Sequence, residues 1–261
     1  MNELNQIVGK LMGLPELTSK HGADVDLLII YVHYLMAVLF AVWFAYFLYC
    51  VIRFRKGRNP KADYHGVRGH ASTWLEVGVA VVEAVLLLGF AVPLWAKVVD
   101  DLPPESESTV LRVTAQQFAW NAHYPGKDGV FGRQDARLLG AANKFGYVQD
   151  DPAHADDITP GVNDIHVPLG KAVVIKLTSM DVIHSFKLYN LRVNQDAIPG
   201  LMVPIHFTPT KVGKFQVVCA QLCGNSHSAM RGFFTVDEPA EYDKWLAGFK
   251  AAAGGAPASF E

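Results

Sequence analysis

The sequence predicts a membrane-anchored all-β protein, in which two N-terminal transmembrane helices are followed by a Greek-key β-sandwich. Two long apolar runs lie in the N-terminal part, and short runs rich in Val, Ile, Phe and Thr follow them. Near the C-terminus, one short stretch is dense in Cys, His and Met. Hydrophobic residues make up 51% of the 261 residues, which fits one compact domain plus a membrane anchor.

The N-terminal segment, residues 1–26, is mixed in composition. Its apolar side chains Leu4, Ile7, Val8 and Leu11 recur at helical spacing, which predicts a short amphipathic helix. No basic region followed by an apolar core and a small-residue cleavage site is present, so we expect no signal peptide.

The anchor, residues 27–99, contains two predicted spans at about 27–52 and 73–96. The first span holds no charged residue and exceeds the ~20 apolar residues that a helix needs to cross a bilayer. Basic residues predict that the connecting loop lies in the cytoplasm. They are Arg53, Arg55, Lys56, Arg58, Lys61 and Arg68. Both termini and the β-domain are then expected on the periplasmic, outer side of a bacterial membrane.

The second span carries two carboxyl groups, Glu76 and Glu83, seven residues apart on nearly one helix face. One interpretation is a proton route shared with a partner subunit. The other is that Glu76 reaches the cytoplasmic edge and Glu83 is a neutral, hydrogen-bonded packing residue. Under either interpretation this helix is expected to pack against another polypeptide rather than lipid alone.

A polar linker, residues 100–108, leads into a predicted β-domain, residues 109–237. Strands are predicted at 109–115, 172–177, 215–219 and 232–236. Residues 123–164 form a long connection, which either docks a donor or a neighbouring subunit or packs on its own sandwich. The C-terminal part, residues 238–261, is predicted to form a surface helix followed by a Gly/Ala/Pro tail.

The stretch from Cys219 to Met230 concentrates metal-binding side chains. It contains two cysteines, His227 and a methionine, and His184 lies upstream. This soft donor set suits copper and does not suit magnesium or calcium, and a thioether is not a usual zinc ligand. The alternative for Cys219 and Cys223 is a disulfide.

The second thiolate distinguishes this pattern from a mononuclear blue-copper site, which uses a single thiolate ligand. Cys219 and Cys223 can both bridge two coppers, with His184 and His227 as terminal ligands. Met230 and the main-chain carbonyl of Gln221 can complete the two coordination shells. Sharing one electron over two metals and two sulfurs keeps the geometry change on reduction small, as a one-electron relay requires.

The pattern C-x-x-x-C-G-x-x-H-x-x-M, with D-V-x-H-S upstream, resembles cytochrome c oxidase subunit II, which carries the dinuclear CuA centre. The resemblance spans about residues 25–237 and includes the two apolar spans, Gln117–Trp120 and Asp196–Gly200. It implies a cupredoxin-like sandwich. It also implies an electron relay that accepts electrons from a c-type cytochrome and passes them to haem in subunit I. Such a relay is not catalytic on its own.

In such a complex, haem and CuB in subunit I reduce oxygen to water and protons are translocated. The implied partners are subunit I, other membrane subunits and the lipid bilayer, and the implied location is the bacterial inner membrane. By the same resemblance, Glu76 matches a residue at the mouth of the K proton channel. The family usually has Pro at the position of Glu83.

Two further departures concern the β-domain. Gln221 stands where the family has a Glu that also binds magnesium, which makes a magnesium site doubtful here. Phe118 stands where the family has the Trp that receives electrons, with Trp120 behind it. His123, His154, His166 and His206 lack partners at ligand spacing and are interpreted as ordinary residues.

Two alternative functions remain open from the sequence. One is the electron-input subunit of a CuA-containing nitric oxide reductase, which differs in its partner subunit. The other is a membrane-anchored copper-binding or copper-delivery protein. The net charge of −2 does not imply a nucleic-acid partner.

Overall fold

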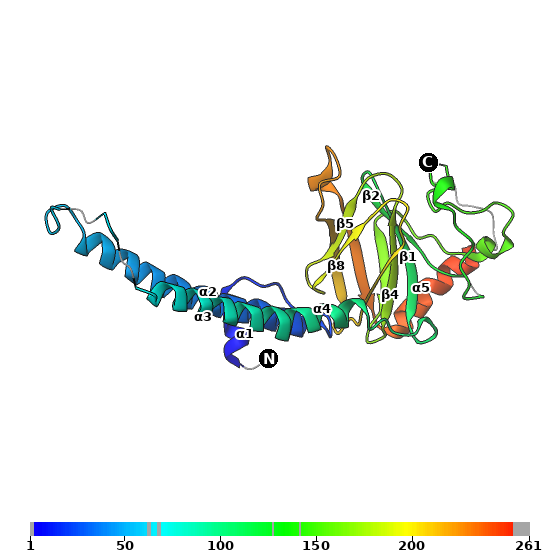
Figure 1. Ribbon diagram of the computed structural model, residues 1–261. Coiled ribbons are helices and arrows are strands. Elements are labelled where there is room, and N and C mark those ends of the chain that lie inside the picture. The colour runs from blue at the N-terminus through cyan, green and yellow to red at the C-terminus, as the bar shows by residue number, and fades with distance from the viewer. Residues whose placement is uncertain (1–2, 62–63, 67–68, 127, 141, 253–261) are drawn as a thin grey trace. The chain divides into compact units, whose positions relative to one another are not determined.

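The computed structural model describes residues 3–61, 64–66, 69–126, 128–140 and 142–252. It forms two compact units, one made of residues 1–14 and 24–97 and the other of residues 15–23 and 98–261 (Figure 1). Arg68 of the predicted basic loop and the predicted Gly/Ala/Pro tail lie outside the described residues.

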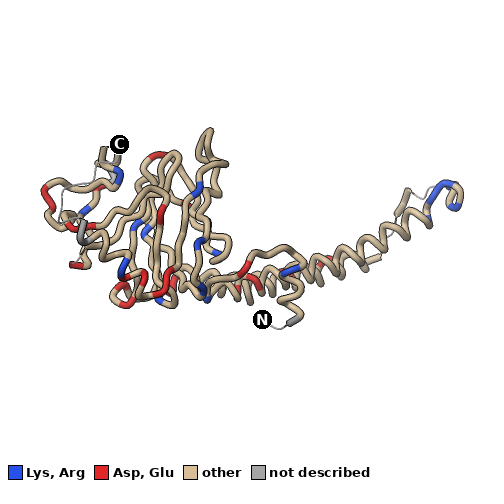
Figure 2. Tube along the Cα trace, turned by 180° about the vertical axis from the view of Figure 1, so that it is seen from behind, with Lys and Arg blue, Asp and Glu red and all other residues tan. Residues whose placement is uncertain are grey.

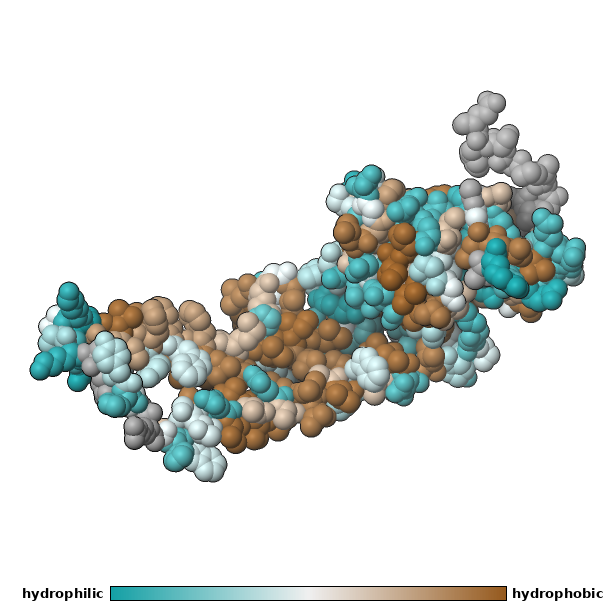
Figure 3. Space-filling model, turned by 45° about the horizontal axis from the view of Figure 1, so that its top comes forward, coloured by the Kyte–Doolittle hydropathy of each residue, from teal (hydrophilic) through white to brown (hydrophobic). Residues whose placement is uncertain are grey.

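The first unit is helical. Its elements are α1 (Glu3–Leu11), α2 (Gly22–Arg53), α3 (Ala71–Leu86), the π-helical turn η1 (Leu87–Ala91) and α4 (Val92–Val99). Two continuous helices, Gly22–Arg53 and Ala71–Val99, are long and apolar enough to cross a membrane, which confirms both predicted spans. They carry hydrophobic side chains along their length (Figure 3), and Lys and Arg cluster in the loop between them (Figure 2).

The π-helical turn in the second span was not predicted, and Pro93 accounts for it. Proline has no N–H, and its ring collides with the carbonyl one turn earlier, which disturbs a helix just before the proline. Here the Val92 N–H reaches back to the Leu87 carbonyl, five residues away. Phe90, inside this turn, packs edge-on against Tyr31 of α2, with ring centroids 5.9 Å apart.

The predicted amphipathic helix at the N-terminus is confirmed as α1. Its inner face packs on α2, where the Tyr34 hydroxyl donates a 3.1 Å hydrogen bond to the side chain of Asn5. Its outer face leaves Leu4, Ile7 and Leu11 exposed.

The second unit is a β-sandwich of two sheets. One sheet has the order β2 (Ala119–His123), β1 (Thr109–Gln116), β4 (Val173–Ser179), β7 (Val203–Phe207). The other has the order β3 (Asp164–Pro168), β9 (Arg231–Asp237), β8 (Gly213–Cys219), β5 (His184–Leu188), β6 (Val193–Ala197). The pairs β1–β4 and β3–β9 are parallel, and the other neighbouring strands in these two sheets are antiparallel. The predicted class, two transmembrane helices followed by a cupredoxin-like sandwich, is confirmed.

The two sheets enclose one hydrophobic core. Trp120, Phe186, Leu111, Ile175 and Phe234 are fully buried in it. Burying each such side chain contributes roughly 1.5–3 kcal/mol. The Trp120 and Phe186 rings meet edge-to-face at 5.3 Å, just below the end of the sandwich where β5 begins.

Four loops meet at that end of the sandwich, which we call the loop end. They are residues 117–118, 180–183, 198–202 and 220–230. The strand register places them together, because Ser179 bridges Pro199, His184 pairs with Ala197, and Phe186 pairs with Cys219. The strands thereby hold these loops on a rigid base.

The segment Pro15–Ala23, which leads into α2, packs on the β-domain, and this contact was not predicted. The Thr18 N–H donates to the Asn190 carbonyl at 2.8 Å, and the Thr18 carbonyl accepts from the Thr210 N–H at 2.9 Å. The buried Ser19 hydroxyl donates to the Leu191 carbonyl at 2.6 Å. The segment is therefore bonded to the turns that follow β5 and β7.

The long connection between β2 and β3 packs on its own sandwich. It contains the 3₁₀ turns η3 (Ala136–Leu138) and η4 (Pro152–Asp156). Its aromatic side chains Phe131, Phe145 and Tyr147 surround the fully buried His123. His123 Nε2 lies 2.8 Å from Asp157 Oδ2, and burial lowers the pKa of this imidazole. His123 is therefore a core histidine that fastens the connection to β2.

The predicted C-terminal helix is confirmed as α5 (Pro239–Ala252). Trp245 of α5 stacks on His166 of β3 at 4.4 Å and packs edge-on against Tyr124 at 5.4 Å. The helix closes the sandwich along β3.

Candidate metal centre

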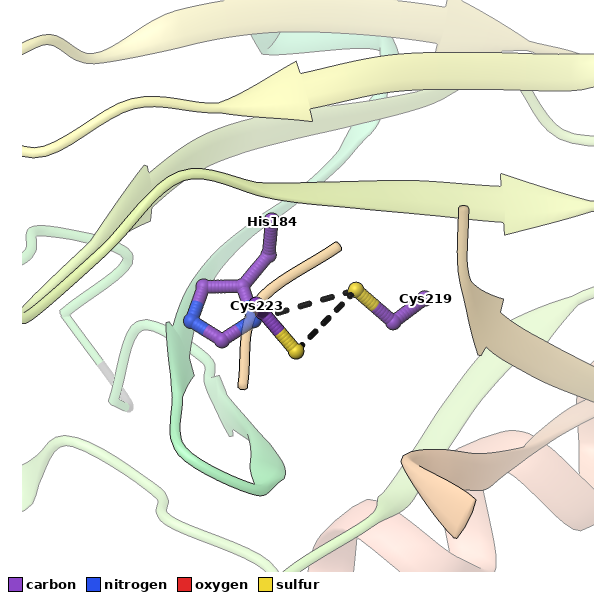
Figure 4. Close-up of side chains that lie close together, drawn as sticks. All are labelled: His184, Cys219 and Cys223. Atoms are coloured by element: carbon purple, nitrogen blue, oxygen red, sulfur yellow. Dashed lines mark hydrogen bonds between the residues drawn. The ribbon is translucent and has the colours of Figure 1, made fainter. Parts of the chain in front are cut away.

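Two strand termini and one loop position the cluster of sulfur and nitrogen atoms at the loop end. Cys219 is the last residue of β8, His184 is the first residue of β5, and Cys223 lies in the loop between β8 and β9. Cys219 Sγ lies 3.7 Å from Cys223 Sγ and 3.8 Å from His184 Nδ1 (Figure 4). These three donor atoms all lie within 4.8 Å of one another.

The remaining predicted ligands surround the two thiols. Cys223 Sγ lies 3.6 Å from His227 Nδ1 and 3.7 Å from Met230 Sδ. Cys219 Sγ lies 3.1 Å from the main-chain oxygen of Gln221. The structure thus brings all six predicted metal-site residues into one cluster.

The cluster is shielded from water unevenly. His184, Cys219, Cys223 and Met230 are buried, whereas His227 is half-buried. Cys219 and Cys223 are free thiols. Burial, together with the neighbouring Cys219, raises the pKa of the Cys223 thiol to about 11. A metal that binds here must therefore displace the Cys223 proton at neutral pH.

The chemistry of the donors fits copper. Two thiol sulfurs, a thioether, two imidazole nitrogens and a carbonyl oxygen form a soft set, and carboxylate oxygens suited to magnesium or calcium are not among them. The Cys223 sulfur faces three other donor atoms at 3.6–3.7 Å. Such a shared central sulfur is what two metal ions bridged by thiolates require.

Asp181 orients His184, and this role was missed in the sequence. Asp181 Oδ1 lies 2.8 Å from His184 Nε2, on the side of the ring away from Cys219. Asp181 Oδ2 accepts a 2.6 Å hydrogen bond from the Gln117 N–H. A carboxylate bound to the second nitrogen of a ligating histidine fixes its tautomer and orientation. Its position, three residues before His184 in the D-V-x-H-S motif, was the available signal.

Gln117 and Phe118 hold the loop that carries Cys223. The Gln117 side-chain amide donates a 2.5 Å hydrogen bond to the Cys223 carbonyl. Gly224, at φ +138°, leaves no room for a side chain, since a Cβ there would lie 2.7 Å from Gln117 Nε2 and 3.1 Å from the Phe118 ring. Phe118 is half-buried against this loop, and Trp120 is fully buried with its ring edge toward His184 at 6.2 Å.

The other residues singled out in the sequence are not part of this cluster. Glu76 and Glu83 are both exposed on α3, in the helical unit. His166 Nδ1 lies 2.6 Å from Asp237 Oδ2 and is engaged there.

An anchored β-sandwich with a soft donor cluster at one end defines a class, the membrane-anchored proteins with a cupredoxin-like domain. Residues 152–235 match the family described as cytochrome c oxidase subunit II, periplasmic domain. The chain is 35% identical over 217 residues to the alternative cytochrome c oxidase subunit 2 of Bradyrhizobium diazoefficiens, covering 83% of this chain and 76% of that protein. It therefore belongs to the cytochrome c oxidase subunit II family.

The chain is also similar to other proteins. The chain is 30% identical over 217 residues to cytochrome c oxidase subunit 2 of Cereibacter sphaeroides, covering 76% of this chain and 67% of that protein. It spans 56% of the length of the 28% identical subunit 2 of Alkalihalophilus pseudofirmus. The solved periplasmic domain of subunit II (CoxB) of Bradyrhizobium japonicum is 28% identical, with a TM-score of 0.42 over 57% of this chain and 96% of that domain.

These relatives are subunits of cytochrome c oxidases. The chain is accordingly a component of a haem-copper oxidase, an oxidoreductase complex. The nitric oxide reductase and copper-delivery alternatives are not favoured.

Proposed function

We propose that this chain is the electron-accepting subunit of its oxidase and that its β-domain holds a dinuclear CuA centre. The proposed ligands are the side chains of His184, Cys219, Cys223, His227 and Met230, and the main-chain oxygen of Gln221. The observation that carries the proposal is the convergence of two free thiols, 3.7 Å apart, with these nitrogen, thioether and carbonyl donors.

When bound, the copper pair supplies one-electron redox chemistry. The protein's part is to hold the donors in one arrangement and to exclude water. His184 and Cys219 sit on strand ends, and Asp181 fixes the imidazole ring from behind. Burial of both thiols and of Met230 keeps the site dry, which limits solvent reorganisation during electron transfer.

The partners follow from the family. We propose a c-type cytochrome as donor and subunit I, with its haem and CuB, as the recipient of the electrons for oxygen reduction and proton translocation. We propose the bacterial inner membrane as the location, with the β-domain and both termini on the periplasmic side. The basic loop Arg53–Arg58 between the two membrane-crossing helices supports this topology.

Four further residues carry proposed roles. Phe118 is half-buried against the loop that carries Cys223, and the buried Trp120 ring lies 6.2 Å from that of His184, which supports a role for this pair in electron entry. We propose that Glu76 and Glu83, which are exposed on α3, face a partner subunit, with Glu76 at the mouth of a proton path. Gln221 offers a neutral amide, so a magnesium site at this position is doubtful.

The test is oxygen uptake by the assembled complex supplied with reduced cytochrome c, combined with copper analysis. Cys223→Ser should lower both the copper content and the uptake, because it removes the sulfur that faces three other donors. Cys50→Ser, which changes the thiol in α2, is the matched control and should leave both unchanged. Normal copper content and normal uptake in Cys223→Ser would refute the proposal.

A further inference from the structure

The two membrane-crossing helices pair in antiparallel register at the end opposite the basic loop. Lys97 Nζ of α4 lies 2.9 Å from Asp24 Oδ2 of α2. The Phe90 and Tyr31 rings meet edge-on, with their centroids 5.9 Å apart. Asp24 and Tyr31 are seven residues apart, as are Phe90 and Lys97. These two contacts therefore fix which residues of the two helices lie at the same height.

A narrow groove lies between the two helices and is bounded by this ion pair and this aromatic pair. Its volume is about 260 Å³, and apart from the ion pair its lining is apolar. Leu27, Leu28, Pro93 and Leu94 contribute to the lining. Gly89 keeps the groove open, since a Cβ at this position would meet nothing within 4 Å. The groove thus offers an apolar channel with one charged end.

The groove belongs to the leaflet opposite the basic loop. Asp24 lies in the first turn of α2, and Lys97 lies in the last turn of α4. The seven residues from Asp24 to Tyr31 rise about 10 Å along the helix. This is less than half of the ~30 Å hydrocarbon core of a bilayer. The ion pair is therefore expected at the level of the lipid headgroups, with the groove beside the upper part of the acyl chains.

The ion pair at the mouth matches one class of headgroup. The side chains of Lys97 and Asp24 are 59% and 50% exposed, so both can take a further partner. A phosphate can accept a hydrogen bond from the Lys97 ammonium, and a primary ammonium can donate one to the Asp24 carboxylate. A choline headgroup has no N–H to donate. An anionic headgroup would bring an uncompensated negative charge close to Asp24.

We propose that this groove binds one phosphatidylethanolamine molecule, a zwitterionic phospholipid with a primary amine. Its headgroup lies on the Asp24–Lys97 pair, and one of its acyl chains lies between α2 and the second span. A partner helix is about 10–12 Å across with its side chains and is too wide for this groove, whereas a single acyl chain is not. The inference concerns the helical unit alone, so its failure would leave the proposed copper centre intact.

The test is lipid binding to the full chain in detergent, measured by native mass spectrometry. The probes are phosphatidylethanolamine, phosphatidylcholine and phosphatidylglycerol with identical acyl chains. We expect one phosphatidylethanolamine per chain, bound about tenfold more tightly than the other two lipids, because a charge-assisted hydrogen bond distinguishes them. Equal binding of the three lipids, or no retained lipid, would overturn the inference.

A variant that fills the groove locates the site. Gly89→Leu should weaken phosphatidylethanolamine binding about tenfold or more, because its side chain occupies the space of the acyl chain. Gly78→Leu is the matched control, since a Cβ there also meets nothing within 4 Å and Gly78 lies outside the groove. It should bind the lipid as the unmodified chain does. Equal binding by the Gly89→Leu and Gly78→Leu chains would overturn the inference.

A second variant tests headgroup recognition without changing the groove. Asp24→Asn should bind phosphatidylethanolamine and phosphatidylcholine about equally, because the carboxylate that accepts from the primary ammonium is lost. Asp101→Asn, at an exposed carboxylate of the linker, is the control and should keep the preference. An unchanged preference in Asp24→Asn would show that this carboxylate does not recognise the headgroup and would overturn the inference.

The assembled oxidase distinguishes a lipid from a partner subunit as the occupant. A phosphatidylethanolamine with a photoreactive group in its acyl chain is added to membranes that hold the complex. Cross-links are expected within residues 27–31 and 89–94, and excess unlabelled phosphatidylethanolamine should suppress them. Cross-links between these residues and another subunit, without lipid labelling, would show that a subunit covers the groove and would overturn the inference.

Discussion

Asp181 and His184 meet side chain to side chain at 2.8 Å, Oδ1 to Nε2, while the other ring nitrogen of His184 points to Cys219. The carboxylate thereby fixes both the proton position and the direction of the imidazole. Asp181→Ala should weaken copper binding about 10- to 100-fold, the usual effect of removing such a partner. Competition with a copper chelator measures this change.

The matched control for this variant is Asp150→Ala, an exposed carboxylate of the long connection. It should leave copper affinity unchanged. Equal affinities for Asp181→Ala and the unmodified chain would show that His184 is held by the fold alone.

Gly224 fixes the path of the metal loop. A Cβ at this position would lie 2.7 Å from Gln117 Nε2, and φ of +138° is unfavourable for other residues. Gly224→Ala should break the Gln117–Cys223 hydrogen bond and lower the unfolding free energy by about 1–3 kcal/mol. Thermal unfolding measures this, with Gly161→Ala, where a Cβ meets nothing within 4 Å, as control. Equal losses of unfolding free energy in both variants would show that the metal loop does not need glycine at position 224.

The segment Pro15–Ala23 is expected to add stability to the β-domain. Thr18→Pro removes the N–H that donates to Asn190, at a cost of about 1–3 kcal/mol, because the Asn190 carbonyl loses its partner. The loosened segment should also be cut faster by trypsin after Lys20. Thr18→Ser keeps the main-chain hydrogen bonds and is the control. Unchanged stability and cleavage in Thr18→Pro would show that the segment contributes nothing.

His123 should make the β-domain acid-sensitive. Burial lowers the pKa of His123 below its ordinary 6.5, partly offset by Asp157, and Arg112 lowers it further. As the pH falls, the His123 imidazole is protonated in the unfolded chain before it is protonated in the folded chain. The stability that the buried, neutral His123 contributes is therefore present above about pH 6.5 and is lost as the pH falls toward the lower pKa of the folded state. The melting temperature of His123→Gln should therefore fall less between neutral and mildly acidic pH than that of the unmodified chain. Parallel pH profiles would contradict this.

Much of the fold could be predicted because its signals are local. Both spans follow from uninterrupted apolar runs, and β1, β4, β8 and β9 follow from runs rich in β-branched and aromatic residues. The strand β7 was not predicted, because Pro204 lies inside it and a proline within a sequence segment indicates that the segment is not a strand. β6 was missed because Val193–Ala197 is mostly polar on an edge strand.

At the candidate site, the cysteines, histidines and methionine could be selected because one short loop supplies most of them. The contacts that support these residues could not be predicted from the sequence, because they join distant parts of the chain. Gln117 reaches Cys223 across 106 positions, and Thr18 reaches Asn190 across 172. No local pattern encodes such pairs, so they appear only when the strands are assembled.

The dinuclear centre is tested by measuring the copper content and the low-temperature electron paramagnetic resonance spectrum of the full chain, purified in detergent and loaded with copper. A dinuclear centre predicts two coppers per chain, with hyperfine structure from one electron shared equally between them. It also predicts that Cys219→Ser and Cys223→Ser each abolish this signal. One copper per chain with a mononuclear spectrum would rule out the dinuclear centre.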